Sequence, residues 1–563
     1  MNIIRKIIYI SLIALLYFSP SCEAQNIFQT DNPKYEVRAV WLTTIGGLDW
    51  PHNYAQNSFS IEKQKKELID ILDKLKEENI NTVLFQTRIR GTVIYPSSIE
   101  PWDGCCSGVP GKSPGYDPLA FAIEECHKRG MEIQAWVVTI PVGKWNGYGC
   151  KTLRKKYPKL IVKSNNEGFI NPSSPQAASY IADICKEITS RYDVDGIHLD
   201  YIRYPETWKL NISNDKARDN ITNIVRSIYS SIKTIKPWVK LSCSPIGKYN
   251  DLNRFSSHGW NAYTKGCQDA QGWLRLGIMD QLYPMMYFRN DQFFPFAFDW
   301  KENCCERTIV PGLGIYFLSP NEGNWQAEDI QRQMFVLRDN NMGYAFFRNK
   351  FFCDNVKGVY DFTKYHINKY PALVPPMTWS SKRKPEAPTE LKVIRNKDSQ
   401  TIVWNNVSDN ISNGGILYNV YASNVYPVNT DDARNLIAQR IKNNYITITD
   451  NKPMFYAVRS IDRYGIESCS VQEVYKQEET VKDKFIENDG YKMLLPDKGK
   501  TLDADYIIIE SLTGTIIKTM PYKGKYADIS SLKDGCYVVL SLNKKSVTHR
   551  LGHLMIKRKK PNN

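Results

Sequence analysis

Residues 195–205 have the sequence DGIHLDYIRYP, and this stretch decides how the first part of the chain is interpreted. The run from Ile197 to Ile202 has the apolar composition of a buried strand, yet it contains His198 and Asp200. An isolated charge in such a strand would cost several kcal/mol, roughly, unless it were paired or solvated. The pattern therefore indicates a strand whose carboxyl end opens onto a polar site.

Eight strand-like segments lie between residues 36 and 349, and helix-like segments separate most of them. After Ser60, which we expect to be a helix N-cap, Ile61, Leu68, Leu72 and Leu75 recur at helical spacing. Further helices are expected from Asp117-Pro118 and near 176–190, 215–236 and 326–340. The expected strands are 36–44, 82–89, 131–138, 197–202, 239–245, 281–288, 308–316 and 342–349.

Alternation of strands and helices predicts an α/β fold, and eight is the number of strands that closes a (β/α)8 TIM barrel. An open doubly wound sheet is the alternative. The Gly-rich segment GVPGKSPG (108–115) does not lie between a strand and a helix start, as the phosphate loop of such a sheet requires. In a barrel, the carboxyl ends of the strands meet at one face, which places Asp200 at the mouth.

After residue 372 the sequence changes character. We expect a Pro- and Lys-rich linker over 373–385, and then short alternating strands over 386–476 that predict an all-β sandwich. A second set of short strands over 485–563 predicts another β-sandwich. The expected architecture is thus an α/β barrel over 30–372 followed by two all-β sandwich domains.

The N-terminus has the pattern of a secretory signal over 1–24. Arg5 and Lys6 precede the apolar run IIYISLIALLYF, which is too short for a membrane span. Cleavage after Ala24 and lipoprotein-type cleavage before Cys22 both fit. The sequence predicts an exported protein of the cell envelope, in the periplasm or on the outer-membrane surface, where a lipidated Cys22 would attach it to the membrane.

The composition narrows the range of partners. The chain of 563 residues has a formal net charge of +15 and a hydrophobic content of 42%, which favours folded domains. The excess charge fits a Lys-rich solvated surface or attraction to an anionic polymer. The sequence has no basic stripe interleaved with aromatic residues, the pattern that would indicate nucleic-acid binding. The 13 cysteines form no paired CxxC motif, so a structural zinc site is not predicted. We expect neither a metal nor a cofactor. Disulfides are permitted in an exported chain, with the loop cysteines as candidates.

The expected mouth of the barrel is rich in aromatic and charged side chains. Aromatic rings stack on sugar faces and charged groups bind hydroxyls, so this composition suits a saccharide. For each residue other than Asp200, pairing at the barrel rim explains its position equally well. The candidate substrate-binding residues are Asp49, Trp50, Gln86, Arg88, Trp136, Arg203, Tyr204, Tyr287 and Arg348.

Four long motifs carry a family resemblance: RAVWLTTIGGLDWP, YPSSIEPWDG, GYDPLAFAIEECHKRGMEIQAW and DGIHLDYIRYP. Together they resemble the glycosyl-hydrolase-like family 10 domain, a barrel family of exported bacterial proteins. The resemblance implies a glycoside hydrolase acting on peptidoglycan glycan strands stripped of stem peptides, with Asp200 as the principal catalytic carboxylate. The segment beginning PEAPTELKV resembles a fibronectin type III domain, and the last segment is similar to the C-terminal sorting domain of Bacteroidetes secreted proteins.

The sequence also departs from that family's pattern. Tyr201 stands where many members have a second Asp, and the segments RIRGTV and QAWVVT lack an expected Asp and Asn. These changes keep two alternatives open: a non-catalytic carbohydrate-binding surface protein, and a hydrolase of a dietary or host glycan.

Glycoside cleavage usually needs a second carboxyl group. The candidates are Asp291 first, then Glu322, followed by Asp49 and Asp103. We expect Arg203 to favour the ionised form of Asp200, and His198 to be a packed histidine of the core.

Overall fold

The computed structural model describes residues 32–253, 255, 259–395, 398–407, 414–449, 452, 454–473, 476–478, 485–495, 504–544 and 547–558. The expected signal sequence, with Cys22, lies outside the described residues. Among the described helices, none combines the length and the apolar character that crossing a membrane requires.

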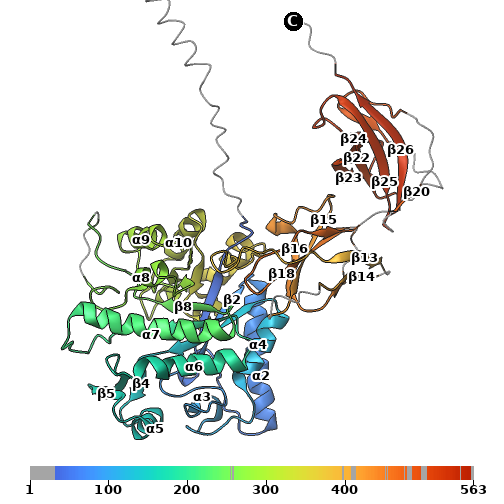
Figure 1. Ribbon diagram of the computed structural model, residues 1–563. Helices are drawn as coiled ribbons and strands as arrows, with labels where there is room; N and C mark the ends of the chain where they lie inside the picture. The colour runs from blue at the N-terminus through green and yellow to red at the C-terminus, as the bar shows by residue number, and fades with distance from the viewer. Residues whose placement is uncertain are drawn as a thin grey trace, which may run out of the picture.

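A curled parallel sheet forms the centre of the first part of the chain (Figure 1). Its order is β10-β9-β8-β7-β3-β2-β1-β12-β11, and its two outermost strands belong to one segment, 308–313. That segment pairs with β9 on one side and with β12 on the other, so the ladder returns on itself. The predicted α/β barrel is confirmed as a curled parallel sheet. Its strands are β1 Arg38–Leu42, β2 Thr82–Arg88, β3 Glu132–Val138, β7 Gly196–Asp200, β8 Lys240–Ser244, β9 Gln281–Leu282, β10 Thr308–Ile309, β11 Gly312–Leu313 and β12 Tyr344–Phe346.

Several predicted strands are shorter than expected, and proline explains the shortening of two of them. The strand expected over 281–288 ends at Leu282, two residues before Pro284, and the strand expected over 308–316 is interrupted at Pro311. A proline cannot donate to a ladder because it lacks the backbone N–H group.

Helices follow most of the strands and pack on the outside of the sheet (Figure 1). The prediction that Ser60 is an N-cap is wrong: α2 begins at Ser58, and the Asn57 side chain accepts from the Ser60 backbone N–H. Asp117 caps α4 as expected, accepting from Leu119 N and Ala120 N. The helices of this part are α2 Ser58–Glu77, α3 Gly104–Ser107, α4 Pro118–Lys128, α6 Ala177–Arg191, α7 Asn214–Ile235, α8 Ala270–Arg275, α9 Phe294–Glu302, α10 Ala327–Asp339, α11 Asn349–Cys353 and α12 Val359–Phe362.

A small sheet and a helix interrupt the chain between β3 and α6. The sequence did not predict this insertion, which contains β4 Pro141–Lys144, α5 Tyr148–Lys156, β5 Ile161–Ser164 and β6 Glu167–Ile170. Its three strands pair in the order β4-β6-β5. Thr139, just before β4, donates both its backbone N–H and its hydroxyl to the carbonyl of Asp200, at 2.9 and 2.8 Å. The insertion therefore leaves the carboxyl end of the sheet beside the expected site.

A series of hydrogen-bonded side chains crosses the barrel interior among the buried rings of Trp41, Trp136 and Tyr283. The indole of Trp41 donates to Nε2 of His198 at 3.2 Å, which leaves the proton of the neutral imidazole on Nδ1, 2.8 Å from Ser242 Oγ. Burial lowers the pKa of His198 to about 3. His198 is thus a neutral histidine of the core.

The second part of the chain consists of several small, mainly antiparallel sheets, which confirms its expected all-β character. The sheets β13-β14-β17 and β16-β15-β18-β19 enclose a core that includes Trp404, Tyr418 and Val458. The sheets β20-β26-β25-β22-β23 and β21-β24 lie further along the chain. The strands are β13 Thr389–Arg395, β14 Gln400–Asn405, β15 Leu417–Ser423, β16 Leu436–Ile441, β17 Tyr445–Ile448, β18 Phe455–Ile461, β19 Val471–Gln472, β20 Lys476–Glu478, β21 Lys492–Leu494, β22 Tyr506–Ser511, β23 Ile516–Pro521, β24 Tyr526–Asp528, β25 Gly535–Leu542 and β26 Val547–Ile556.

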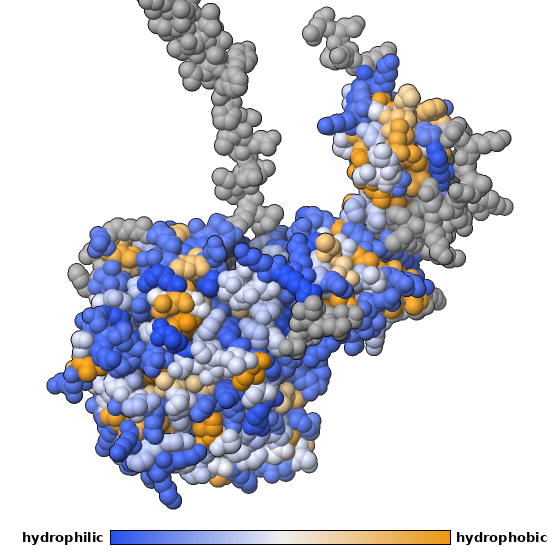
Figure 2. Space-filling view, viewed as in Figure 1, coloured by the Kyte–Doolittle hydropathy of each residue, from blue (hydrophilic) through white to orange (hydrophobic). Residues whose placement is uncertain are grey.

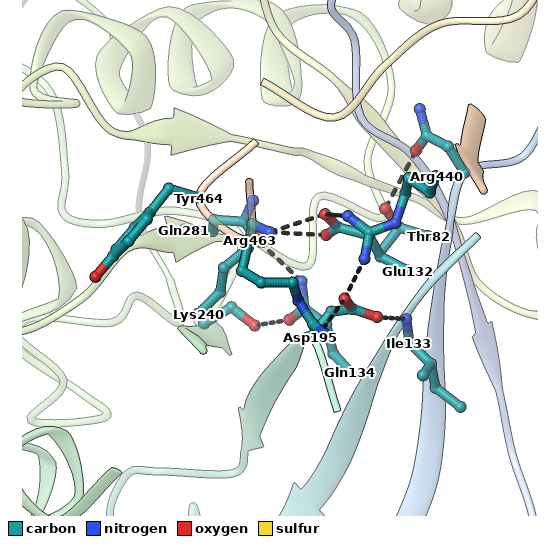
Figure 3. Close-up of polar contacts among 12 residues, drawn as sticks. Thr82, Glu132, Ile133, Gln134, Asp195, Lys240, Gln281, Arg440, Arg463 and Tyr464 are labelled. Carbon is teal, nitrogen blue, oxygen red and sulfur yellow. Dashed lines mark hydrogen bonds and ion pairs between the residues drawn. The ribbon is translucent and has the colours of Figure 1, made fainter. Parts of the chain in front are cut away.

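An ionic cluster joins the two parts at the amino ends of the barrel strands (Figure 3). Arg440, in β16, pairs with Glu132 at 3.0 Å and with Asp195, and Lys240 binds both oxygens of Glu132 at 2.9 Å. Burial opposes ionisation of Asp195, but Arg440 and His127 hold its pKa well below the ordinary range. The β-sheet part thus covers the end of the barrel opposite the strand carboxyl ends.

Every cysteine in the described part of the chain is a free thiol, including the loop cysteines that the sequence offered as disulfide candidates. Cys105 and Cys106 lie buried beside each other with their sulfurs 3.7 Å apart.

Candidate active site

Asp200 is the last residue of β7, and side chains of both neighbouring strands hold its carboxylate. Trp136 of β3 donates its indole N–H to Oδ2 at 3.1 Å, and Ser244 of β8 donates its hydroxyl to Oδ1 at 2.9 Å. The backbone N–H of Tyr201 also donates to Oδ1, at 2.8 Å. Three donors from three elements fix one orientation of the carboxyl group.

Burial raises the pKa of Asp200 above its ordinary value, although Ser244, Trp136 and the charge of Arg203 act in the opposite direction. A carboxyl group with a raised pKa keeps its proton at higher pH than an exposed one. This is the property required of the general acid in glycoside cleavage.

Tyr201 adopts a left-handed backbone conformation with φ of 56°, which a bulky side chain rarely takes. Its hydroxyl donates to Oε2 of Glu206 at 2.6 Å, and Arg203 donates to Oε1 of the same carboxylate at 2.7 Å. The guanidinium of Arg203 also lies 3.9 Å from the centre of the Tyr201 ring. Tyr201 and Arg203 therefore hold the carboxylate of Glu206, six residues after Asp200.

Glu206 was missed by the sequence analysis because it follows the strand by six residues. Burial opposes its ionisation, but the contacts with Arg203 and Tyr201 lower its pKa below the ordinary value. With 43% of its side chain exposed, Glu206 is accessible to solvent. The two carboxyl groups have pKa values shifted in opposite directions, as an acid and an ionised partner require.

Half-buried aromatic rings line the mouth near Asp200. Burial raises the pKa of Tyr287 well above its ordinary value, and the charge of Asp200 adds to this effect, which places the phenol near that carboxylate. The ring of Tyr287 lies 5.3 Å from Phe347 and 5.7 Å from Tyr316, and Phe317 stacks on Trp325 at 4.6 Å. These rings form what we call the aromatic wall: Tyr287, Tyr316, Phe317, Trp325 and Phe347.

Asp49, Trp50 and Arg348 connect the loop after β1 to the segment after β12. Asp49 is buried and accepts from Thr43, from Arg348 at 2.7 Å and from Lys350 N at 2.8 Å. Trp50 is fully buried, and its indole donates to a carbonyl of α2 at 3.0 Å. All three have structural contacts that explain their positions, and only Arg348 is partly exposed.

Gln86, Arg88 and Tyr204 also have partners within the protein. The Gln86 amide oxygen accepts from the backbone of Thr44 and Ile45, at 2.9 and 2.8 Å. Arg88 is fully buried and forms a bidentate ion pair with Glu100, at 2.9 and 2.7 Å. Tyr204 is 2% exposed.

The remaining carboxylate candidates are not among the groups that hold the Asp200 carboxylate. Asp291 lies exposed in the short helix η2 Asn290–Gln292, and Glu322 lies exposed in the turn after η3 Ile315–Leu318. Asp103 caps α3 and accepts the hydroxyl of Thr92 at 2.6 Å. Of the sequence candidates, Asp200, Trp136, Arg203 and Tyr287 come together.

Comparison with known proteins identifies the class. Residues 36–215 and 206–316 match the model of the family described as "Glycosyl hydrolase-like 10". The chain therefore carries a glycosyl hydrolase-like 10 domain.

Two curated relatives are called glycosyl hydrolases. "Glycosyl hydrolase YngK" of Bacillus subtilis is 29% identical over 475 residues, which cover 77% of this chain and 92% of the relative. "Glycosyl hydrolase DigH" of Escherichia coli is 29% identical over 294 residues, covering 46% of this chain and 67% of the relative.

Solved structures also match. The glycoside hydrolase domain of PgaB (BpsB) from Bordetella bronchiseptica has a TM-score of 0.40 at 13% identity, and the match covers 59% of this chain and 98% of that one. The alpha-L-fucosidase isoenzyme 2 from Paenibacillus thiaminolyticus has a TM-score of 0.39 at 13% identity. That match covers 58% of this chain and 49% of the fucosidase chain.

Proposed function

We propose that this protein is an exported glycoside hydrolase whose substrate is the glycan strand of peptidoglycan stripped of stem peptides. The observation that carries the proposal is Asp200: a carboxyl group with a raised pKa, held by three donors and adjacent to an aromatic wall suited to sugar rings. The family match and the relatives named as glycosyl hydrolases support the reaction class.

In the proposed mechanism Asp200 donates its proton to the glycosidic oxygen as the bond to the anomeric carbon breaks. Glu206, kept ionised by Arg203 and Tyr201, either activates a water molecule at that carbon or attacks it. The proton lost from water returns to the acid–base pair, so the net reaction is hydrolysis. Asp291 and Glu322, both exposed, are the alternative partners.

The proposed site of action is the cell envelope. This rests on the signal-like N-terminus, with Arg5, Lys6 and the apolar run, and on Cys22 as the residue for lipid attachment.

The test compares the mature chain, beginning at Gln25, with the Asp200→Asn, Glu206→Gln, Asp291→Asn and Glu322→Gln variants. Each is incubated with denuded peptidoglycan, intact peptidoglycan and neutral and anionic glycans of dietary or host type, and released sugars are identified by mass spectrometry. Products from denuded strands that are lost in Asp200→Asn and Glu206→Gln but kept in the other two are expected. If products come only from another glycan, that glycan is the substrate instead of denuded peptidoglycan. If activity is lost in Asp291→Asn or Glu322→Gln but kept in Glu206→Gln, that residue is the second carboxylate instead of Glu206.

Tyr201 favours one other function, that of a carbohydrate-binding protein without turnover. Its ring stands where many family members have a second Asp. Binding of glycans with no products from any substrate, unchanged by Asp200→Asn, would identify this function.

A further inference from the structure

A cavity of about 410 Å³ lies between the insertion after β3 and the loop after β7. Both segments leave carboxyl ends of adjacent strands, because Val138 of β3 pairs with Asp200 of β7. Tyr204 and Trp208, which line the cavity, follow Asp200 by four and eight residues. The cavity therefore lies on the segments that follow the carboxyl ends of β3 and β7, as the candidate active site does.

The floor and walls of this cavity provide a ring and uncharged polar groups. The indole of Trp208 is half-buried and packs edge-on against Tyr204 at 5.8 Å and Phe169 at 6.2 Å, which holds it in place. The hydroxyls of Ser173 and Tyr204 are 3.3 Å apart, and the amide of Asn220 donates to both, at 3.0 and 3.2 Å. A fixed ring beside ordered polar groups is the composition of a sugar subsite.

The charged side chains that line the cavity are all positive. Lys163 and Lys209 line it, and none of the described residues that line it is acidic. The surrounding insertion extends this pattern, since residues 141–170 contain seven Lys or Arg residues and one acidic residue, Glu167. Glu167 in turn lies 3.7 Å from Arg90, which partly offsets its charge. In Figure 2 the surface over α5, at the lower left, is mainly hydrophilic.

We infer that this cavity is a subsite for a sugar residue that carries a carboxylate, with Lys163 and Lys209 binding the carboxylate and Trp208 the sugar ring. The inference rests on the proposed function and deepens it. Removal of a stem peptide frees a carboxylate on every second sugar of a peptidoglycan strand, whereas a chitin-type strand has none. The subsite would thus favour denuded strands over neutral ones at a place beyond the cleaved bond.

The test measures binding in the Asp200→Asn background by titration calorimetry, so that no substrate is consumed. The probes are denuded glycan strands, the same strands with their carboxylates reduced to alcohols, and a polyuronate of similar length. We expect the carboxylated strands to bind about tenfold more tightly than the reduced strands, and Lys163→Gln/Lys209→Gln to abolish that difference. The double variant Lys151→Gln/Lys159→Gln, in exposed positions of the same insertion, is the matched control and keeps the difference.

Equal binding of carboxylated and reduced strands overturns the inference. Loss of the preference in the control pair as well overturns it too, because the effect would then be general attraction rather than a subsite. Preferential binding of the polyuronate over denuded strands keeps the cationic subsite but assigns it to uronate sugars. A parent chain that releases no products yet keeps the preference contradicts the hydrolase proposal alone.

Discussion

The indole N–H of Trp136 lies 3.1 Å from Oδ2 of Asp200, across the pairing of β3 with β7. Because this donor binds the ionised form of the carboxyl group, it lowers the pKa that burial raises. Trp136 is therefore a positioning residue that sets both the orientation and the protonation of Asp200.

Trp136→Phe removes the donor and keeps most of the ring. The pKa of Asp200 should rise further, so the limb of the pH–kcat/KM profile that belongs to Asp200 moves to higher pH by about one unit. Trp379→Phe is the matched control, since the Trp379 indole also donates to an aspartate, Asp280, at 3.0 Å. A lower rate with an unmoved profile would mean that Trp136 acts only through packing.

The aromatic wall predicts a change in substrate affinity. Trp325, which stacks on Phe317 at 4.6 Å, is half-buried and lies near the mouth. Trp325→Ala should raise KM about fivefold with kcat little changed, because stacking on a sugar contributes about 1 kcal/mol in both ground and transition states. Trp325→Phe should restore most of the affinity. A fall in kcat at constant KM would place the ring at the reacting centre instead.

Much of the barrel could be predicted from the sequence because its strands are apolar runs separated by capped helices. β2, β3, β7 and β8 lie where expected, whereas prolines shorten the ladder at 281–288 and 308–316, a local effect that apolar composition does not reveal. The insertion 141–170 was missed because its strands are only four residues long. Short strands carry little periodic signal.

The site was predicted only in part, since position after a strand does not give side-chain direction. Trp136 and Asp200 meet because adjacent strands are in register. Arg88 points instead to Glu100, twelve residues further on, and Trp50 points into the core. Glu206 was not a candidate, because the left-handed turn at Tyr201 that presents it has no sequence signature outside glycine and asparagine.

His198 predicts a pH dependence of stability. Its pKa is lowered to about 3 by burial, so the folded state binds fewer protons than the unfolded state. The stabilisation is present above about pH 6.5 and is lost as the pH falls toward 3, at up to about 1.4 kcal/mol per unit. His198→Gln should flatten this slope in urea unfolding between pH 7 and 4, whereas the exposed His52→Gln should not. An unchanged slope in His198→Gln would contradict the assignment.

Arg440 joins the β-sheet part to the barrel through charges that are almost fully buried. Its side chain is 9% exposed, against 2% for Glu132 and 3% for Asp195. Arg440→Met would leave Asp195 to His127 and Arg463, and Glu132 to Lys240, at a cost of about 3–5 kcal/mol. Arg434→Met, which breaks an exposed pair with Asp432, should destabilise the chain far less.

The loss of stability in Arg440→Met should appear in calorimetry as a lower temperature of the first unfolding transition. Because the two parts then unfold separately, two transitions should be resolved. Hydrolysis of glycan at 25 °C should be unchanged, because the cluster lies at the amino ends of the strands and Asp200 at the carboxyl end of β7. A single transition lowered no more than in Arg434→Met would show that apolar contacts, rather than the ionic cluster, hold the parts together. Lost hydrolysis in a folded Arg440→Met chain would show instead that the β-sheet part controls the mouth through the barrel.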